Sequence, residues 1–213
     1  MESYFLDSDE LLKMRFTRRS RRQRLAAAIE HGRRLVKEQK DQEALAFLEK
    51  AARDFPESPE MPLMLATIYR DSRPEAIPIQ LAKAANLGSD DPVIQVLVGH
   101  RFLNEGDFDS ARSCATRAEA SVDFDFPLFA DLEGLRGRIA ARDGDYAVAE
   151  EKLRSALRRE PECFTHWVHL ARFLWARGRD EDALTVIDES LPQVREDIDT
   201  DLLEQLRSEI TAS

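Results

Sequence analysis

The sequence has few of the residues that interrupt regular structure. Only 8 glycines and 9 prolines occur in 213 residues, and β-branched residues are scarce beside Ala, Leu, Arg and Glu, which favour helices. No run of about 18 apolar residues is present, so we expect no membrane-spanning helix. The acidic start MESYFLDSDELL also lacks the basic and apolar regions of a signal peptide. These absences predict an all-α protein of the cytoplasm.

Cysteines and catalytic motifs are equally sparse. The two cysteines, Cys114 and Cys163, have no metal-binding or redox spacing and indicate reduced thiols. The sequence contains no phosphate-binding loop, dinucleotide-binding glycine motif, HExxH or GxSxG. His166 and His169 are three residues apart, but we interpret the pair as lacking a companion cysteine or acidic motif. We therefore expect no catalytic residue, no cofactor and no metal.

Charge is distributed unevenly along the chain. The net charge is −10, yet residues 11–40 carry 11 Lys and Arg against two Glu. Residues 180–213 carry 11 Asp and Glu against two Arg. One end is basic and the other acidic, an asymmetry that bears on the choice of partners.

Glycine, alanine and aromatic residues recur in one repeating order. From Gly137 the chain has Ala140, then Gly-Asp-Tyr at 144–146, then Ala149, Leu153, Ala156 and Pro161. Three other stretches carry the same order of residue types: Gly99 with Phe102, Gly-Asp-Phe at 106–108, Ala111, Ala115 and Ala118; Trp167 with Leu170, Ala171, Leu174, Gly178, Ala183 and Ile187; and Gly32 with Leu35, Ala44, Leu48, Ala51 and Pro56.

This order resembles the tetratricopeptide repeat, a helix–turn–helix unit of 34 residues. In that family, small residues let the two helices approach closely, glycine adopts positive φ in the turn, and proline ends the second helix. Gly144 and Gly178 are 34 residues apart, whereas Gly106 and Gly144 are 38 apart, which indicates a four-residue insertion around 121–127.

The resemblance implies an all-α, right-handed superhelical solenoid of about five units, with an N-terminal helical extension and a C-terminal capping helix. The extension covers residues 1–24 and includes an arginine-rich segment; a helix in it begins near Asp9. The capping helix covers residues 198–213 and has apolar residues at helical spacing. The predicted units are residues 25–58, 59–90, 91–126, 127–163 and 164–197.

In this family the first helices line a concave groove, and the residues at groove positions here are mostly basic. The resemblance therefore implies a cradle for an acidic or carboxylate-bearing peptide, held by arginine. The alternative is a row of solvated arginines paired with neighbouring acids. For Trp175 the alternative is packing under the C-terminal capping helix. The predicted groove residues are Arg33, Lys37, Arg70, His100, Arg138, Arg142, His169, Arg172 and Trp175.

Two other segments are candidate contact sites. Phe124 and Phe126 in the inserted loop either dock a partner or fill a widened gap between hairpins. The arginine run either contacts an anionic surface such as nucleic acid or forms a solvated helix face; it comprises Arg18, Arg19, Arg21, Arg22 and Arg24.

The sequence thus predicts a non-enzymatic adaptor or assembly factor that binds a segment of another protein. A nucleic-acid-associated regulator that uses the N-terminal arginines is the alternative. A further alternative is a scaffold that self-associates head to tail, with the basic end of one copy on the acidic end of the next.

Overall fold

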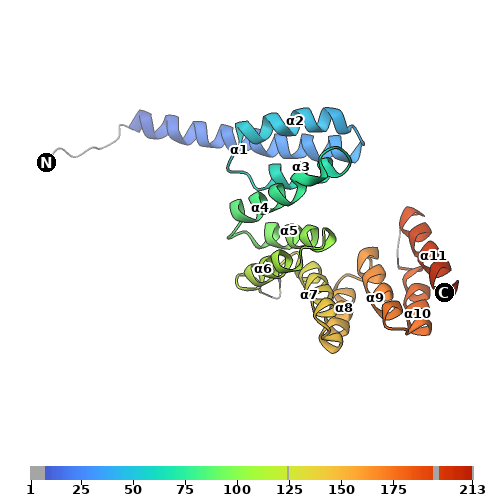
Figure 1. Ribbon diagram of the computed structural model, residues 1–213. Coiled ribbons are helices and arrows are strands. Elements are labelled where there is room, and N and C mark those ends of the chain that lie inside the picture. The colour runs from blue at the N-terminus through green and yellow to red at the C-terminus, as the bar shows by residue number, and fades with distance from the viewer. Residues whose placement is uncertain (1–7, 124, 194–196, 213) are drawn as a thin grey trace. The chain divides into compact units, whose positions relative to one another are not determined.

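The protein is all-helical in the computed structural model. The structure describes residues 8–123, 125–193 and 197–212, without the side chains of residues 8–19 and 197–199. Over these residues it contains eleven α-helices, one 3-10 turn and no strand, which confirms the predicted all-α class (Figure 1). Within the same residues, no helix combines the length and the apolar composition needed to cross a membrane.

The chain divides into two compact units between Gly88 and Ser89. In the first unit α1 packs on α2 and α3, and α3 packs on α4. The arginine-rich segment lies within α1 and is continuous with the helix that forms the first hairpin. The helices are α1 (Ser8–Lys37), α2 (Asp41–Asp54), α3 (Glu60–Ser72) and α4 (Ile77–Leu87), with a 3-10 turn at Pro74–Ala76.

The second unit contains three helical hairpins and a final single helix. Each hairpin begins with a helix that contacts both its own partner and the first helix of the next hairpin: α5 touches α6 and α7, and α7 touches α8 and α9. This is how a stack of helical repeats buries its apolar surface. The helices are α5 (Pro92–Asn104), α6 (Phe108–Glu119), α7 (Phe129–Asp143), α8 (Tyr146–Arg159), α9 (Phe164–Ala176), α10 (Asp180–Ser190) and α11 (Asp197–Thr211).

Glycine followed by aspartate forms the turns of the first two hairpins in this unit. Gly106 and Gly144 have φ of 82° and 84°, a left-handed conformation that ends a helix and that side chains with a Cβ rarely adopt. Asp107 and Asp145 then accept hydrogen bonds from the backbone N–H groups of Ser110 and Val148 at 3.1 and 3.2 Å. One dipeptide therefore ends the first helix and caps the second.

The helices of a hairpin cross closely at small residues. A Cβ atom on Gly137 of α7 would lie 2.8 Å from Cγ of Leu153 and 3.1 Å from the backbone oxygen of Ala149, both on α8. Only hydrogen fits in that space. The glycine that begins the repeat pattern is therefore required by packing rather than by backbone conformation.

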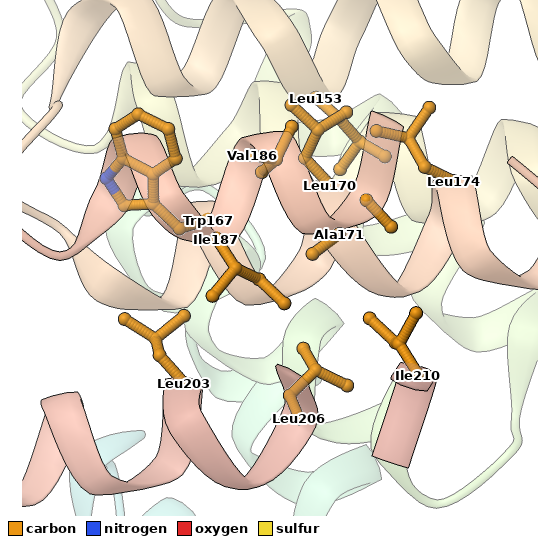
Figure 2. Packing of buried hydrophobic residues seen from close by; sticks show 11 residues of the cluster. Leu153, Trp167, Leu170, Ala171, Leu174, Val186, Ile187, Leu203, Leu206 and Ile210 are labelled. Atoms are coloured by element: carbon orange, nitrogen blue, oxygen red, sulfur yellow. The ribbon is translucent and has the colours of Figure 1, made fainter. Parts of the chain in front are cut away.

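The last hairpin is covered by the amphipathic helix α11. Leu203, Leu206 and Ile210 are at most 3% exposed and join the core formed by α9 and α10. Figure 2 shows these three side chains pointing from α11 toward Ile187 and the other labelled residues. The apolar face of α11 thus closes the end of the stack, and its other face carries exposed acids.

Replacing Gly137 with valine should destabilise the second unit by about 1–3 kcal/mol, because the new side chain would displace Leu153 or the backbone of α8. Denaturant unfolding followed by tryptophan fluorescence measures this. The matched control is Ala147→Val, an exposed site on α8, where only the difference in helix propensity of about 0.5 kcal/mol applies. Equal losses in the two variants would contradict the tight crossing.

Two adjacent leucines test the role of α11. Leu203 is fully buried, whereas Leu202 is 46% exposed. Leu203→Ala should therefore lower the free energy of unfolding by about 2–4 kcal/mol, and Leu202→Ala by less than about 1 kcal/mol. Urea unfolding reported by Trp167, which belongs to the same core, distinguishes them. If the two variants unfold alike, α11 does not cover the last hairpin as described.

Candidate functional site

A groove of about 480 Å³ lies in the second unit. The first helices of three successive hairpins, α5, α7 and α9, supply most of its lining. Three of the predicted groove residues, Arg138, His169 and Arg172, are among the residues that line it. The remaining lining residues are Leu103, Asn104, Ala141, Tyr146, Leu153, Phe173, Ala176 and Arg177.

Three guanidinium groups give the groove its charge. Arg138 on α7 is partly buried and donates a hydrogen bond to the side-chain oxygen of Asn104 at 2.8 Å. Arg177 lies over the ring of Tyr146, 3.7 Å from its centroid. Arg172 on α9 is exposed. Among the described residues, no carboxylate forms an ion pair with any of these arginines, so their charge is left uncompensated by side chains of the unit.

Burial lowers the pKa of Arg138, and the neighbouring charge of Arg172 lowers it further. Arginine nevertheless keeps its charge at any ordinary pH. The two guanidinium groups therefore repel each other in a partly desolvated place. An anion bound between them would relieve this repulsion.

Two histidines lie beside the arginines and are neutral. His100 and His169 stack with their ring centroids 6.5 Å apart. Nε2 of His100 is 2.9 Å from the backbone oxygen of Asp131, so it carries the proton, and Nδ1 faces the guanidinium of Arg138 at 3.4 Å. Burial lowers the pKa of His100. Burial, reinforced by Arg138 and His100, lowers the pKa of His169 to about 3.

Nδ1 of His169 is buried and has no hydrogen-bond partner in the described part of the chain. A buried polar atom without a partner costs free energy. The groove therefore offers a bound ligand uncompensated positive charge, and the neutral His169 beside it carries an unsatisfied buried nitrogen.

The remaining predicted groove residues do not line this groove. Arg142 is exposed and lies over the ring of Phe108, 4.7 Å from its centroid. Trp175 is half-buried and packs against the core of the last hairpin. Arg33, Lys37 and Arg70 are exposed residues of the first unit, on α1 and α3.

The structure describes the two other candidate segments in part. Phe124 lies outside the described residues, whereas Phe126 is half-buried and donates its backbone N–H to the oxygen of Asp123 at 3.2 Å. The side chains of Arg18 and Arg19 also lie outside them.

The described part of the arginine run lies on α1 in the first unit. Arg21 pairs with Glu57 at 2.9 Å, and Arg22 is exposed. Arg21 and Arg24 line a separate pocket of about 410 Å³ with Lys50 and Asp54. One residue of this run therefore already has a carboxylate partner within its own unit.

Four residues line the groove although the repeat pattern did not predict them there: Asn104, Tyr146, Phe173 and Arg177. Tyr146 is the third residue of the Gly-Asp-Tyr turn, which the repeat pattern assigns to packing, yet it is 42% exposed and lines the groove. Arg177 directly precedes the turn glycine Gly178, outside the helical register from which groove positions were read. A search of the turns beside the first helices would have found both residues.

Comparison with known proteins identifies the repeat. A family model described as tetratricopeptide repeat matches residues 99–154 and 135–198. No curated protein sequence matches the chain.

Solved structures share the fold at low sequence identity. PilF of Pseudomonas aeruginosa is 17% identical with a TM-score of 0.67, over 91% of each chain. PilW, a type IV pilus biogenesis factor, is 19% identical with a TM-score of 0.69, over 89% of this chain and 91% of its own. A thermophilic repeat protein of Thermus thermophilus is 20% identical with a TM-score of 0.69, over 89% of this chain and all of its own. Residues 99–198 therefore carry tetratricopeptide repeats, and the chain has the fold of that superfamily.

Proposed function

We propose that the chain is a non-enzymatic adaptor or assembly factor that holds an acidic or carboxylate-bearing segment of another protein in the groove of its second unit. Tetratricopeptide repeats typically bind other proteins through the helices that line such a groove. The observation that carries the proposal is the placement of Arg138 and Arg172 on one groove without carboxylate partners in the described residues.

A carboxylate is the ligand that suits these arginines best. Guanidinium groups bind carboxylates through two parallel hydrogen bonds, and the partial burial of Arg138 strengthens such a contact by excluding water. The imidazole of His169, which also lines the groove, is neutral and therefore adds no positive charge of its own. An acidic side chain or a free chain terminus would provide the matching oxygens.

The groove also has an apolar side. The rings of Tyr146 and Phe173 lie 6.5 Å apart by their centroids, and both line the groove. Aromatic rings bury much apolar area at low conformational cost. We therefore propose that the bound segment carries an apolar side chain next to its acidic group.

Two charge reversals test the groove. Arg172→Glu with Arg177→Glu, both at exposed sites, should weaken binding of a fluorescent peptide that carries Glu, Leu and a free C-terminal carboxylate. The expected loss is at least about tenfold, since hydrogen bonds to charged groups contribute about 1.5–3 kcal/mol each. Fluorescence anisotropy measures the affinity.

The matched control is Arg117→Glu with Arg158→Glu. Both residues lie on helices of the same unit, and neither lines the groove. The control changes the net charge by the same amount, so it isolates position from overall charge. A peptide that binds the groove variant as tightly as the wild type would reject the groove as its site.

Neutral His169 gives a second, pH-dependent test. A histidine in the unfolded chain has a pKa of about 6.5, whereas His169 in the folded chain has a pKa of about 3. Acid therefore favours the unfolded chain, and stability falls as the pH drops below about 6.5. Between about pH 7 and pH 5 this residue should cost the wild type at most about 2 kcal/mol.

His169→Gln should remove the contribution of His169 to the pH dependence of the unfolding free energy, measured by denaturant unfolding at about pH 7 and about pH 5. Both tryptophans lie on α9, so fluorescence reports the second unit. His31→Gln, in the first unit, should leave the pH dependence of the fluorescence transition as in the wild type. Equal slopes for wild type and His169→Gln would mean that His169 is not held neutral by the fold.

A further inference from the structure

Three side chains with metal-binding atoms meet where α8 gives way to α9. Glu160 directly follows α8, Cys163 directly precedes α9, and His166 lies in the first turn of α9. One ligand atom from each residue lies within 4.8 Å of the other two. This cluster is separate from the groove residues and serves no part of the proposed peptide binding.

The backbone fixes this arrangement. The N–H of Cys163 donates to the oxygen of Glu160, and the N–H of His166 donates to the oxygen of Cys163, both at 3.1 Å. Two successive turns of three residues therefore bring the three side chains to one side of the junction. The cluster is a consequence of the local fold and not of long side chains that happen to meet.

His166 supplies the observation that points to a ligand. It is 2% exposed, and neither ring nitrogen forms a hydrogen bond of good geometry among the described residues; its polar neighbours are the Cys163 thiol and, 3.7 Å from Nε2, the carboxylate of Glu160. Nδ1 faces Gly134, 3.5 Å from the position that a Cβ atom would occupy there. A buried imidazole whose nitrogens lack well-formed hydrogen bonds costs free energy. A cation bound at the other nitrogen would offset that cost.

The spacing fits a tetrahedral metal better than a hydrogen bond. Nε2 of His166 and Oε2 of Glu160 are 3.7 Å apart, which is too far for a hydrogen bond. Nitrogen and oxygen ligands of a tetrahedral zinc ion lie about 3.4 Å apart, given metal–ligand bonds of about 2.1 Å. Small rotations of the partly exposed Glu160 and Cys163 side chains would bring all three atoms into that geometry.

We propose that Glu160, Cys163 and His166 bind a divalent transition metal of the zinc class. The donor set of thiolate, imidazole and carboxylate suits zinc and its substitute cobalt, and water would fill the fourth position. The two anionic ligands match the charge of the ion. The metal would connect the end of one hairpin to the start of the next.

The electrostatics of the cysteine are consistent with this role. The neighbouring imidazole of His166 lowers the pKa of the Cys163 thiol against the effect of its partial burial. The same contact raises the pKa of His166 against the effect of burial. A metal binds the thiolate and the neutral imidazole, so its binding would displace a proton from this pair. By contrast, burial raises the pKa of Cys114 to about 11.

The structure gives His166 different neighbours from those considered in the sequence. The pattern paired His166 with His169, three residues further on, and counted no companion cysteine or acid. In the structure His169 lines the groove instead, and the companions of His166 are Cys163 and Glu160, three and six residues earlier. The E-x-x-C-x-x-H spacing was visible in the sequence, but only the helix junction places its members together.

Cobalt chloride titrated into the tag-free, reduced full-length chain tests the proposal. Binding should produce thiolate-to-cobalt charge-transfer absorption that saturates at one ion per chain, and zinc chloride should displace it. Zinc should also raise the melting temperature of the chain, and a chelator should reverse that rise, because a ligand that binds only the folded state stabilises it.

Cys163→Ser should abolish the charge-transfer absorption and lower zinc affinity by at least about tenfold, since even changes to groups behind a ligand cost that much. Glu160→Gln, at a partly exposed site, should weaken zinc binding while it keeps the sulfur absorption. Cys114→Ser, which removes the other cysteine, should bind cobalt as the wild type does.

Circular dichroism confirms that each variant is folded before titration. Absence of thiolate absorption in the wild type would overturn the proposal. Equal cobalt spectra from wild type and Cys163→Ser would overturn it as well. Loss of the absorption in Cys114→Ser but not in Cys163→Ser would also reject this cluster. None of these results depends on peptide binding in the groove.

Discussion

The close crossing of two helices at Gly137 is the constraint on which the second unit depends. Leu153 occupies the space that a side chain on Gly137 would fill, so α7 and α8 pack as one hairpin. Gly99 holds the corresponding place on α5: a Cβ atom there would lie 3.2 Å from Cβ of Cys114 on its partner α6 and 2.7 Å from Cδ2 of Leu135 on α7, the first helix of the next hairpin. Because each hairpin is this compact, the first helices of successive hairpins can touch. The groove exists because α5, α7 and α9 follow one another without a second helix between them.

The features that suit the groove to an anion also lower the stability of the second unit. Burial of Arg138 and His169 beside each other lowers the pKa of both groups, so their charged forms are disfavoured in the folded chain. A core made of apolar residues would not carry that cost. The compensation within the unit is partial: Arg138 bonds to Asn104, and His100 bonds to a backbone oxygen. What the unit leaves unsatisfied is what an anionic partner can satisfy.

The fold was predictable from the sequence because the residue types that a helical hairpin needs recur at corresponding positions of several repeats. Gly106 and Gly144 recur at the same place in the pattern, and both adopt positive φ. The site was less predictable. The repeat register places Arg138 of α7 and Arg172 of α9 at equivalent positions, and both line the groove. It carries no information on Arg177, which lies in a turn. For Trp175 the sequence left two places open, the groove and the space under the capping helix, and in the structure it packs against the core that α11 joins.

The junction between α8 and α9 lies beside both the candidate metal ligands and the helix that carries Arg172. Trp167 donates from Nε1 to the backbone oxygen of Pro161 at 2.7 Å, which ties the start of α9 to the turn that precedes it. Cys163 lies in the same turn, and His166 directly precedes Trp167 on α9. The turn that precedes α9 therefore holds two of the proposed metal ligands, Glu160 and Cys163, and fixes the start of the helix that carries Arg172 in the groove.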